Sequence, residues 1–185
     1  MSPDTLTRRQ LFESFGSLPT TLGATLRTFP RKMWIYKDST TAQSIHNLVW
    51  QFADDEVFEY VNCRKFTGNL GASPLTVASP KSPRGAEYFY QNIKDAMRIV
   101  RGLRLAAYGF IRTLPEQVWD SPVELPIHGK VTLSDWLQIR DRYASSQIQK
   151  MSQIHLTWLA TRFDRDQDSA VYASVSAHSL AGTEA

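Results

Sequence analysis

The chain has 185 residues, a formal net charge of +3 and one cysteine, Cys63. This length is typical of one domain, and 42% hydrophobic residues are enough to bury a core. No apolar run is long enough to cross a bilayer, and no apolar segment follows the arginines near the N-terminus, so we expect neither a membrane span nor a secretory signal. With a single cysteine, this predicts a reducing cytoplasm. The small net charge does not predict nucleic-acid binding.

Four segments carry apolar residues every three or four positions, which is the spacing of an amphipathic helix. They cover residues 5–29, with a kink or a fresh start near Pro19, then residues 40–65, residues 83–114, and a last stretch from Thr132. Three of the predicted starts carry capping signals: Thr40 with Gln43, Ser82 before Pro83, and Thr132 with Asp135.

The connections between these helices are long. Residues 67–83 are rich in glycine and proline, and residues 115–131 predict a loop with a brief hairpin that turns at His128-Gly129. Long connections of this kind are found in some four-helix bundles. The sequence therefore predicts an all-α protein, an antiparallel four-helix bundle over residues 1–164. Residues 165–185 are small and polar, and we expect a loosely ordered tail there.

Four short runs occur in this order along the chain: Leu18-Pro-Thr-Thr-Leu, Gln51-Phe-Ala-Asp-Asp-Glu, His128-Gly-Lys-Val-Thr-Leu and Gln153-Ile154. Their order and spacing resemble the DinB/YfiT-like bundles, a family of metal-dependent enzymes that includes thiol-dependent transferases. The resemblance covers roughly residues 8–160. It implies a four-helix bundle and a homodimer that pairs through helix faces.

The family's motif is a histidine on the second helix, in a His-Leu-x-Asp context, and a His-x3-His pair on the fourth. Three imidazoles hold a divalent metal with open positions for water or a thiol. The resemblance places these ligand positions on Gln51, Ser146 and Lys150, and only Asp54 matches the motif. A lysine repels a dication, since two unit charges 4 Å apart interact by roughly 4 kcal/mol at an effective dielectric constant near 20. We therefore expect no metal and no other cofactor.

The remaining histidines do not restore the metal site. His46 and His155 each lie five residues from a ligand position, about 140° around the helix, while His128 lies in the hairpin and His178 in the tail. We interpret them as exposed or capping residues. Cys63 lies beside Arg64, which would lower the pKa of the thiol, although a partly buried, inert cysteine is the simpler interpretation.

Lys150 with Asp54 or Asp55 is the main polar combination that the altered motif leaves. As an ion pair it would be a polar plug in the core; in an open pocket, Lys150 would bind an anion or act as a base or nucleophile. A basic stripe on the third helix is interpreted as a solvated face, with no nucleic acid as partner; its members are Lys94, Arg98 and Arg101.

The leading hypothesis is a small-molecule binding or interaction protein, with a ligand in the bundle interior. Its expected binding residues are Gln51, Asp54, Asp55, Ser146 and Lys150. The alternative is an enzyme: a metal-dependent hydrolase or a thiol-dependent transferase with a different ligand set, or a metal-free catalyst that uses Lys150. A third hypothesis is a structural dimer without a ligand.

Overall fold

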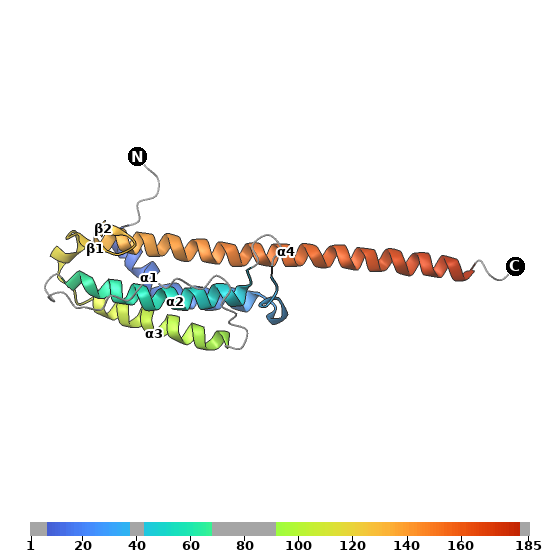
Figure 1. Cartoon of the computed structure of the whole chain (residues 1–185), viewed down its shortest axis with the longest axis horizontal. Coiled ribbons are helices and arrows are strands. Elements are labelled where there is room, and N and C mark those ends of the chain that lie inside the picture. Colours follow the sequence, from blue (N-terminus) through green and yellow to red (C-terminus); the bar gives the residue numbers. More distant parts are fainter. Residues whose placement is uncertain (1–6, 38–42, 68–91, 182–185) are drawn as a thin grey trace, which may run out of the picture.

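The computed structural model describes residues 7–37, 43–67 and 92–181, with side chains up to Phe163. Four helices make up most of it: α1 Arg8–Thr28, α2 Ile45–Arg64, α3 Ile93–Ile111 and α4 Leu133–Ala181 (Figure 1). Short 3₁₀ turns occur at η1 Arg31–Met33, η2 Lys65–Thr67 and η4 Glu116–Trp119. The predicted all-α four-helix bundle is confirmed.

A small hairpin precedes α4. Strands β1 Val123–Leu125 and β2 Gly129–Val131 pair antiparallel, with Glu124 opposite Lys130. Gly129 has a φ of 68°, a left-handed conformation that glycine adopts without strain. The hairpin predicted around His128-Gly129 is therefore present.

Two pairs of neighbouring helices run in the same direction. In the α1–α4 pair, Ser14 donates a hydrogen bond to Asp141, and fifteen residues later along α1 the ring of Phe29 lies 5.0 Å from that of His155. In the α2–α3 pair, Arg104 bonds Glu56 midway along both helices, and Figure 1 shows the two helices running the same way. Only part of the bundle is therefore antiparallel.

The other two interfaces are antiparallel. Between α2 and α4, Glu59 accepts a hydrogen bond from Trp136, whereas Asp55, one turn earlier on α2, accepts one from Tyr143. Between α1 and α3, the rings of Phe12 and Tyr108 stack at 4.1 Å near the start of α1 and the end of α3. Consecutive helices that run parallel require the chain to return along the bundle. About 30 Å must be covered for a helix of twenty residues, and this explains the long connection between α2 and α3.

The helix starts agree only in part with the predicted caps. At α4, Asp135 accepts hydrogen bonds from the backbone and hydroxyl of Thr132, whose hydroxyl in turn accepts from the Asp135 backbone, as predicted. At α2, Ser44 is the N-cap and accepts from the Asn47 backbone N–H at 3.1 Å. The predicted start at Thr40 lies outside the described residues.

The third helix also begins later than predicted. Asn92 has extended backbone geometry, and its side chain caps the Lys94 N–H, so α3 starts at Ile93. The prediction of one unbroken helix from Pro83 is therefore wrong. The Ser82-Pro83 start signal itself lies outside the described residues. An Asn side chain satisfies a free helical N–H as well as serine does.

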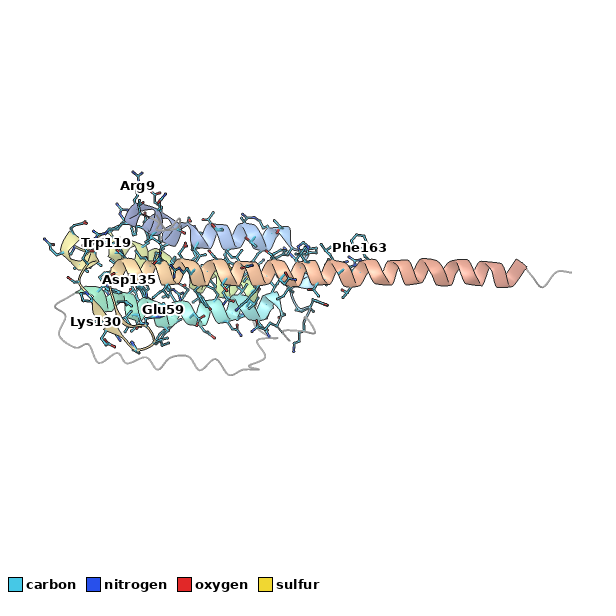
Figure 2. All side chains as sticks on the ribbon, turned by 90° about the horizontal axis from the view of Figure 1, so that it is seen from above. Arg9, Glu59, Trp119, Lys130, Asp135 and Phe163 are labelled. Carbon is cyan, nitrogen blue, oxygen red and sulfur yellow. The ribbon has the colours of Figure 1, made fainter. Side chains whose placement is uncertain are left out.

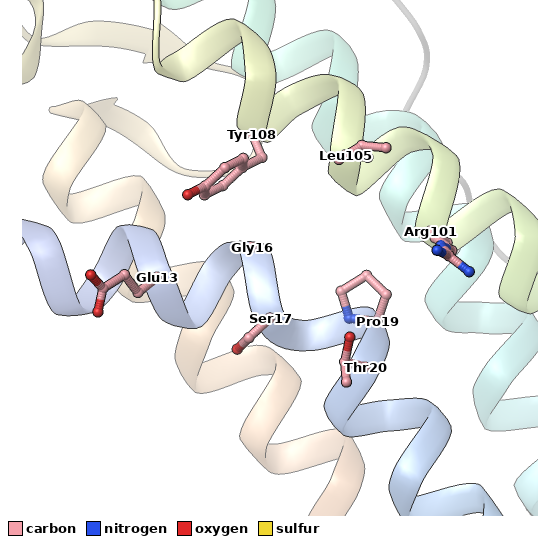
Figure 3. Close-up of a pocket in the computed structure, with 8 residues that line it drawn as sticks. All are labelled: Glu13, Gly16, Ser17, Pro19, Thr20, Arg101, Leu105 and Tyr108. Carbon is pink, nitrogen blue, oxygen red and sulfur yellow. The ribbon is translucent and has the colours of Figure 1, made fainter.

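Helix α1 contains Pro19 without ending there. Proline has no N–H and displaces the carbonyl four residues earlier, here that of Phe15, so the helix bends at this point (Figure 3). Of the two predicted alternatives, a kink is present and a fresh start is not.

Helix α4 extends far beyond its neighbours (Figure 1). Its 49 residues correspond to about 74 Å at 1.5 Å per residue, against about 30 Å for the others. Among its side chains up to Phe163, which are the ones described, the last buried one is Trp158, and Phe163 lies where the helix leaves the bundle (Figure 2). The backbone continues as helix to Ala181, where the sequence predicts a loosely ordered tail. The domain boundary at residue 164 stays a prediction.

The hydrophobic core has two parts. One joins the second half of α1 to the first halves of α2 and α3 and the middle of α4, and includes Leu22 and Phe52. The other joins the opposite ends of these helices to the hairpin, and includes Phe66 and Trp136. Charged residues lie between them, as described below. Within the described ranges, no helix is both long and apolar enough to cross a membrane.

Candidate functional site

The residues predicted to bind a ligand do not converge in the bundle interior. Gln51, Asp54 and Asp55 are partly buried on α2, whereas Ser146 and Lys150 are exposed on α4. Because Lys150 is exposed, it does not form the polar plug in the core that was one of its predicted roles. Tyr143 instead donates a hydrogen bond to Asp55. A binding role for these five residues stays a prediction.

The charged residues that do fill the interior form one layer across the bundle; they come from α2, α3 and α4, and α1 adds an aromatic ring. Glu56 of α2 accepts hydrogen bonds through the same oxygen from Arg104 of α3 and, at 2.5 Å, from Arg140 of α4. The Arg104 guanidinium lies 4.0 Å from the ring centroid of Phe15 on α1, a cation–π contact. We call Phe15, Glu56, Glu59, Arg104 and Arg140 the ionic layer.

Glu59 extends the ionic layer toward the hairpin. Its carboxylate accepts the Trp136 indole N–H at 2.8 Å and contacts His128 Nε2 at 2.9 Å, while Arg140 Nη1 lies 3.7 Å away. Burial alone would raise the pKa of Glu59, but the positive charge of Arg140 and the two hydrogen bonds outweigh burial and lower it. Glu59 is therefore held as a carboxylate.

Asp55, a partly buried acid next to Glu56, shows a pKa shift opposite to that of Glu59. Burial raises the pKa of Asp55, and the hydrogen bond from Tyr143 compensates for only part of that effect. Burial also raises the pKa of the Tyr143 hydroxyl, and the neighbouring Asp55 charge raises it further. Tyr143 therefore stays protonated and serves as a donor.

Cys63 lies next to the layer and is fully buried. Burial raises the pKa of its thiol to about 12, although Arg64 and Arg104 act in the opposite direction. Arg64 itself stacks on Phe110, with 4.2 Å between its guanidinium carbon and the ring centroid. Cys63 is thus a thiol at neutral pH, and a reactive cysteine activated by Arg64 is excluded.

The sequence held a signal for the ionic layer. On α4 the predicted apolar stripe is buried as expected; it consists of Leu133, Leu137, Ala144, Met151, Ile154 and Trp158. Arg140 lies between Leu137 and Ala144, and Gln147 between Ala144 and Met151, so that successive members of the stripe are alternately four and three residues apart. Both side chains are buried. In the same way, Glu56 and Glu59 continue the α2 stripe and Arg104 the α3 stripe. A polar residue in phase with an apolar stripe predicts a buried polar contact.

The loss of the family's metal site stays a prediction. Gln51, Ser146 and Lys150 offer an amide, a hydroxyl and an ammonium group, which do not fit a zinc-like centre. In the part of the chain with described side chains, no three His, Cys, Asp or Glu residues gather into a possible metal site. His128 contacts Glu59 and the His155 ring packs against Phe29, so neither belongs to a cluster of ligands.

Two hollows lie elsewhere, along the groove between α1 and α3. The first has a volume of about 420 Å³, and Figure 3 shows its two walls: Arg101, Leu105 and Tyr108 on α3, and the stretch of α1 from Glu13 to Thr20. Gly16 permits the close approach of the helices here, because a Cβ at this position would lie 2.7 Å from the Tyr108 ring. Glu13 is the acidic residue of this wall.

The second hollow continues the first and shares Pro19, Thr20 and Arg101 with it. Its volume is about 570 Å³, and its walls are apolar with a basic rim. The apolar lining consists of Leu26, Trp34, Ile93 and Met97, and the cations are Arg27, Lys94, Arg98 and Arg101. The stripe that the sequence predicted to be a solvated face thus borders a groove. We call the two hollows together the α1–α3 groove.

Comparison with known proteins supports the fold. No family model and no curated protein matches the sequence. Among solved structures, the chain is similar to YfiT from Bacillus subtilis, described as a probable metal-dependent hydrolase with an unusual four-helix bundle topology. The TM-score is 0.67 at 11% identity, over 83% of this chain and 90% of that one. The chain therefore has the DinB/YfiT-like bundle fold that its short motifs predict.

Proposed function

We propose that this protein is a binding member of the DinB/YfiT-like fold without the usual metal centre, and that it takes amphipathic anions in the α1–α3 groove. One observation supports this most directly: four cations and one carboxylate border two joined hollows, of which the second has mainly apolar walls. Both volumes lie in the range of about 300–1,000 Å³ that is common for ligand sites. We place this function in a reducing cytoplasm, in keeping with the single cysteine.

The ligand class follows from the groove. Ile93, Met97 and Leu105 offer apolar surface along about three turns of α3, a length of roughly 18 Å. Arg98 and Arg101 lie beside them. A flexible apolar chain or a ring system with a sulfonate or carboxylate group matches both features. The binding role that the sequence predicted for an interior site is thereby moved to the outer face of α1 and α3.

The test uses anilinonaphthalene sulfonate, an apolar ring system with one negative charge, as a fluorescent probe, and decanoate as competitor. Arg101→Glu should weaken binding about tenfold, which corresponds to roughly 1.4 kcal/mol. Arg142→Glu is the matched control, because Arg142 is exposed on α4 away from the groove. Equal binding by both variants would contradict the proposal.

The fold itself supports a second candidate, a metal-dependent hydrolase, because the structural neighbour YfiT is described as one. A thiol-dependent transferase or a metal-free catalyst based on Lys150 belongs to the same class of alternatives. Metal content after exposure to zinc and nickel, followed by dialysis, separates the candidates. About one retained ion per chain would favour the hydrolase, whereas loss of metal together with probe binding favours the groove.

We further propose a homodimer in which α4 pairs with a second copy where it leaves the bundle. Leu156 and Phe163 there are 59% and 69% exposed, which is high for large apolar side chains. Most of the stability of a helix in a protein comes from the packing of its apolar face, and a second copy would provide that packing here. Sedimentation velocity should show a dimer for the native chain and a monomer for Leu156→Asp with Phe163→Asp; a monomeric native chain would contradict the pairing.

A further inference from the structure

A small cavity between α1 and α4, on a different face of α1 from the α1–α3 groove, reaches the ionic layer. Its volume is about 90 Å³, the space of roughly three water molecules at ~30 Å³ each. Arg104 and Arg140 line its inner end, and Ser17, Asp141 and Ser145 line its outer part. The cavity therefore connects exposed hydroxyl groups to two arginines that are only 1% and 4% exposed.

Both arginines keep an unused donor. Each donates from Nη2 to the same Oε1 atom of Glu56, yet within the described structure neither Nε–H has a hydrogen-bond partner. Buried donors are almost always satisfied by protein, water or a bound ion. The cavity that these side chains line is where such a partner can be held.

The two arginines differ in how well their charges are compensated. Arg140 contacts both Glu56 and Glu59, and these carboxylates raise its pKa in spite of its burial, whereas Arg104 is bonded to Glu56 alone. Burial lowers the pKa of Arg104 to about 10, since the attraction of Glu56 is opposed by the nearby Arg140. An added negative charge in the cavity would stabilise both cations.

We propose that this cavity binds a small monoanionic oxyanion, with a carboxylate of about the size of acetate as its best fit. The planar carboxylate matches the arrangement of guanidinium N–H groups, which is the basis of arginine–carboxylate recognition. Asp141 lines the same cavity and is hydrogen-bonded by Ser14. Its negative charge disfavours a dianion such as sulfate. The proposal rests on the ionic layer and is independent of the α1–α3 groove.

The first experiment measures the melting temperature in acetate, chloride and sulfate at equal ionic strength. Bound acetate should raise the melting temperature by a few degrees over chloride, increasing with concentration, as expected for a ligand that binds only the folded state. Sulfate stabilises proteins non-specifically, so each salt is also tested on two variants. Ser145→Leu obstructs the cavity, whereas Ser152→Leu makes the same change on an exposed part of α4 outside it.

The specific effect of acetate should persist in Ser152→Leu and disappear in Ser145→Leu. A second measurement follows the arginine Nε–H signals of ¹⁵N-labelled protein, of which those of Arg104 and Arg140 should shift with added acetate. Equal melting temperatures in acetate and chloride would overturn the proposal and leave water as the occupant. An acetate effect that survives in Ser145→Leu, or unchanged arginine signals, would overturn it as well.

Discussion

Helix α3 carries arginines in two different environments. Arg98 is exposed and forms an ion pair with Asp95 on the same helix, whereas Arg104, less than two turns later, is buried and bonded to Glu56 of α2. In the exposed pair, the guanidinium and the carboxylate exchange contacts with water for contacts with each other. Such a pair typically adds only about 0–1 kcal/mol to the free energy of unfolding. The buried pair has lost its water, so each partner depends on the other. Burial, more than residue type, decides what an arginine does in this protein.

The sharpest way to test this contrast is to remove one acid from each pair. Glu56→Gln leaves two buried guanidinium groups without their shared carboxylate, and we expect a loss of about 3–5 kcal/mol in the free energy of unfolding, measured by urea denaturation. Asp95→Asn is the control on the exposed pair and should cost about 0–1 kcal/mol. Similar losses in the two variants would show that Glu56 does not compensate the arginines.

A smaller effect is expected from the pH dependence of Glu59. Its pKa in the folded protein is lowered below the ordinary value of 4.5, so ionised Glu59 stabilises the fold above that pH. The contribution is lost as the pH falls through the folded value. Glu59→Gln should therefore be less stable than the native chain at pH 7, by about 1.5–3 kcal/mol for lost charged hydrogen bonds.

The same comparison at acid pH completes this prediction. The stability difference between the native chain and Glu59→Gln should shrink as the pH is lowered and vanish once Glu59 is protonated in the fold. Denaturation curves at intervals from pH 7 to about pH 3 measure it. A difference that stays constant over this range would mean that Glu59 contributes shape and packing but no charge.

The smallest effect is expected at Lys150, the residue that the sequence placed in the core. Because Lys150 is exposed, Lys150→Met should change the free energy of unfolding by no more than about 0.5 kcal/mol. The adjacent Met151 is fully buried, and Met151→Lys should be strongly destabilising, since it buries an unpaired charge. Thermal denaturation of the two variants is the measurement. A large loss in Lys150→Met would restore its predicted role as a polar plug.

The two α4 positions assigned by the resemblance lie outside the buried stripe of that helix. The resemblance placed the α4 ligand positions on Ser146 and Lys150, whereas the buried stripe runs through Arg140, Ala144 and Gln147. A shift of one residue turns a side chain by about 100°, enough to move it from the core to the solvent. The apolar stripe predicted the buried face of α4 correctly, because its members are buried.

By itself, the sequence determined the amphipathic helices, the cap at Thr132, the hairpin before α4 and the all-α class. These depend on local spacing and on contacts between residues close in the chain. Only the tertiary structure decided that α1 runs parallel to α4 and α2 to α3, and that Glu56 meets Arg104 and Arg140. These partners are 48 and 84 residues apart in sequence. Their contact depends on the rotation and axial position of three helices, which local patterns do not specify.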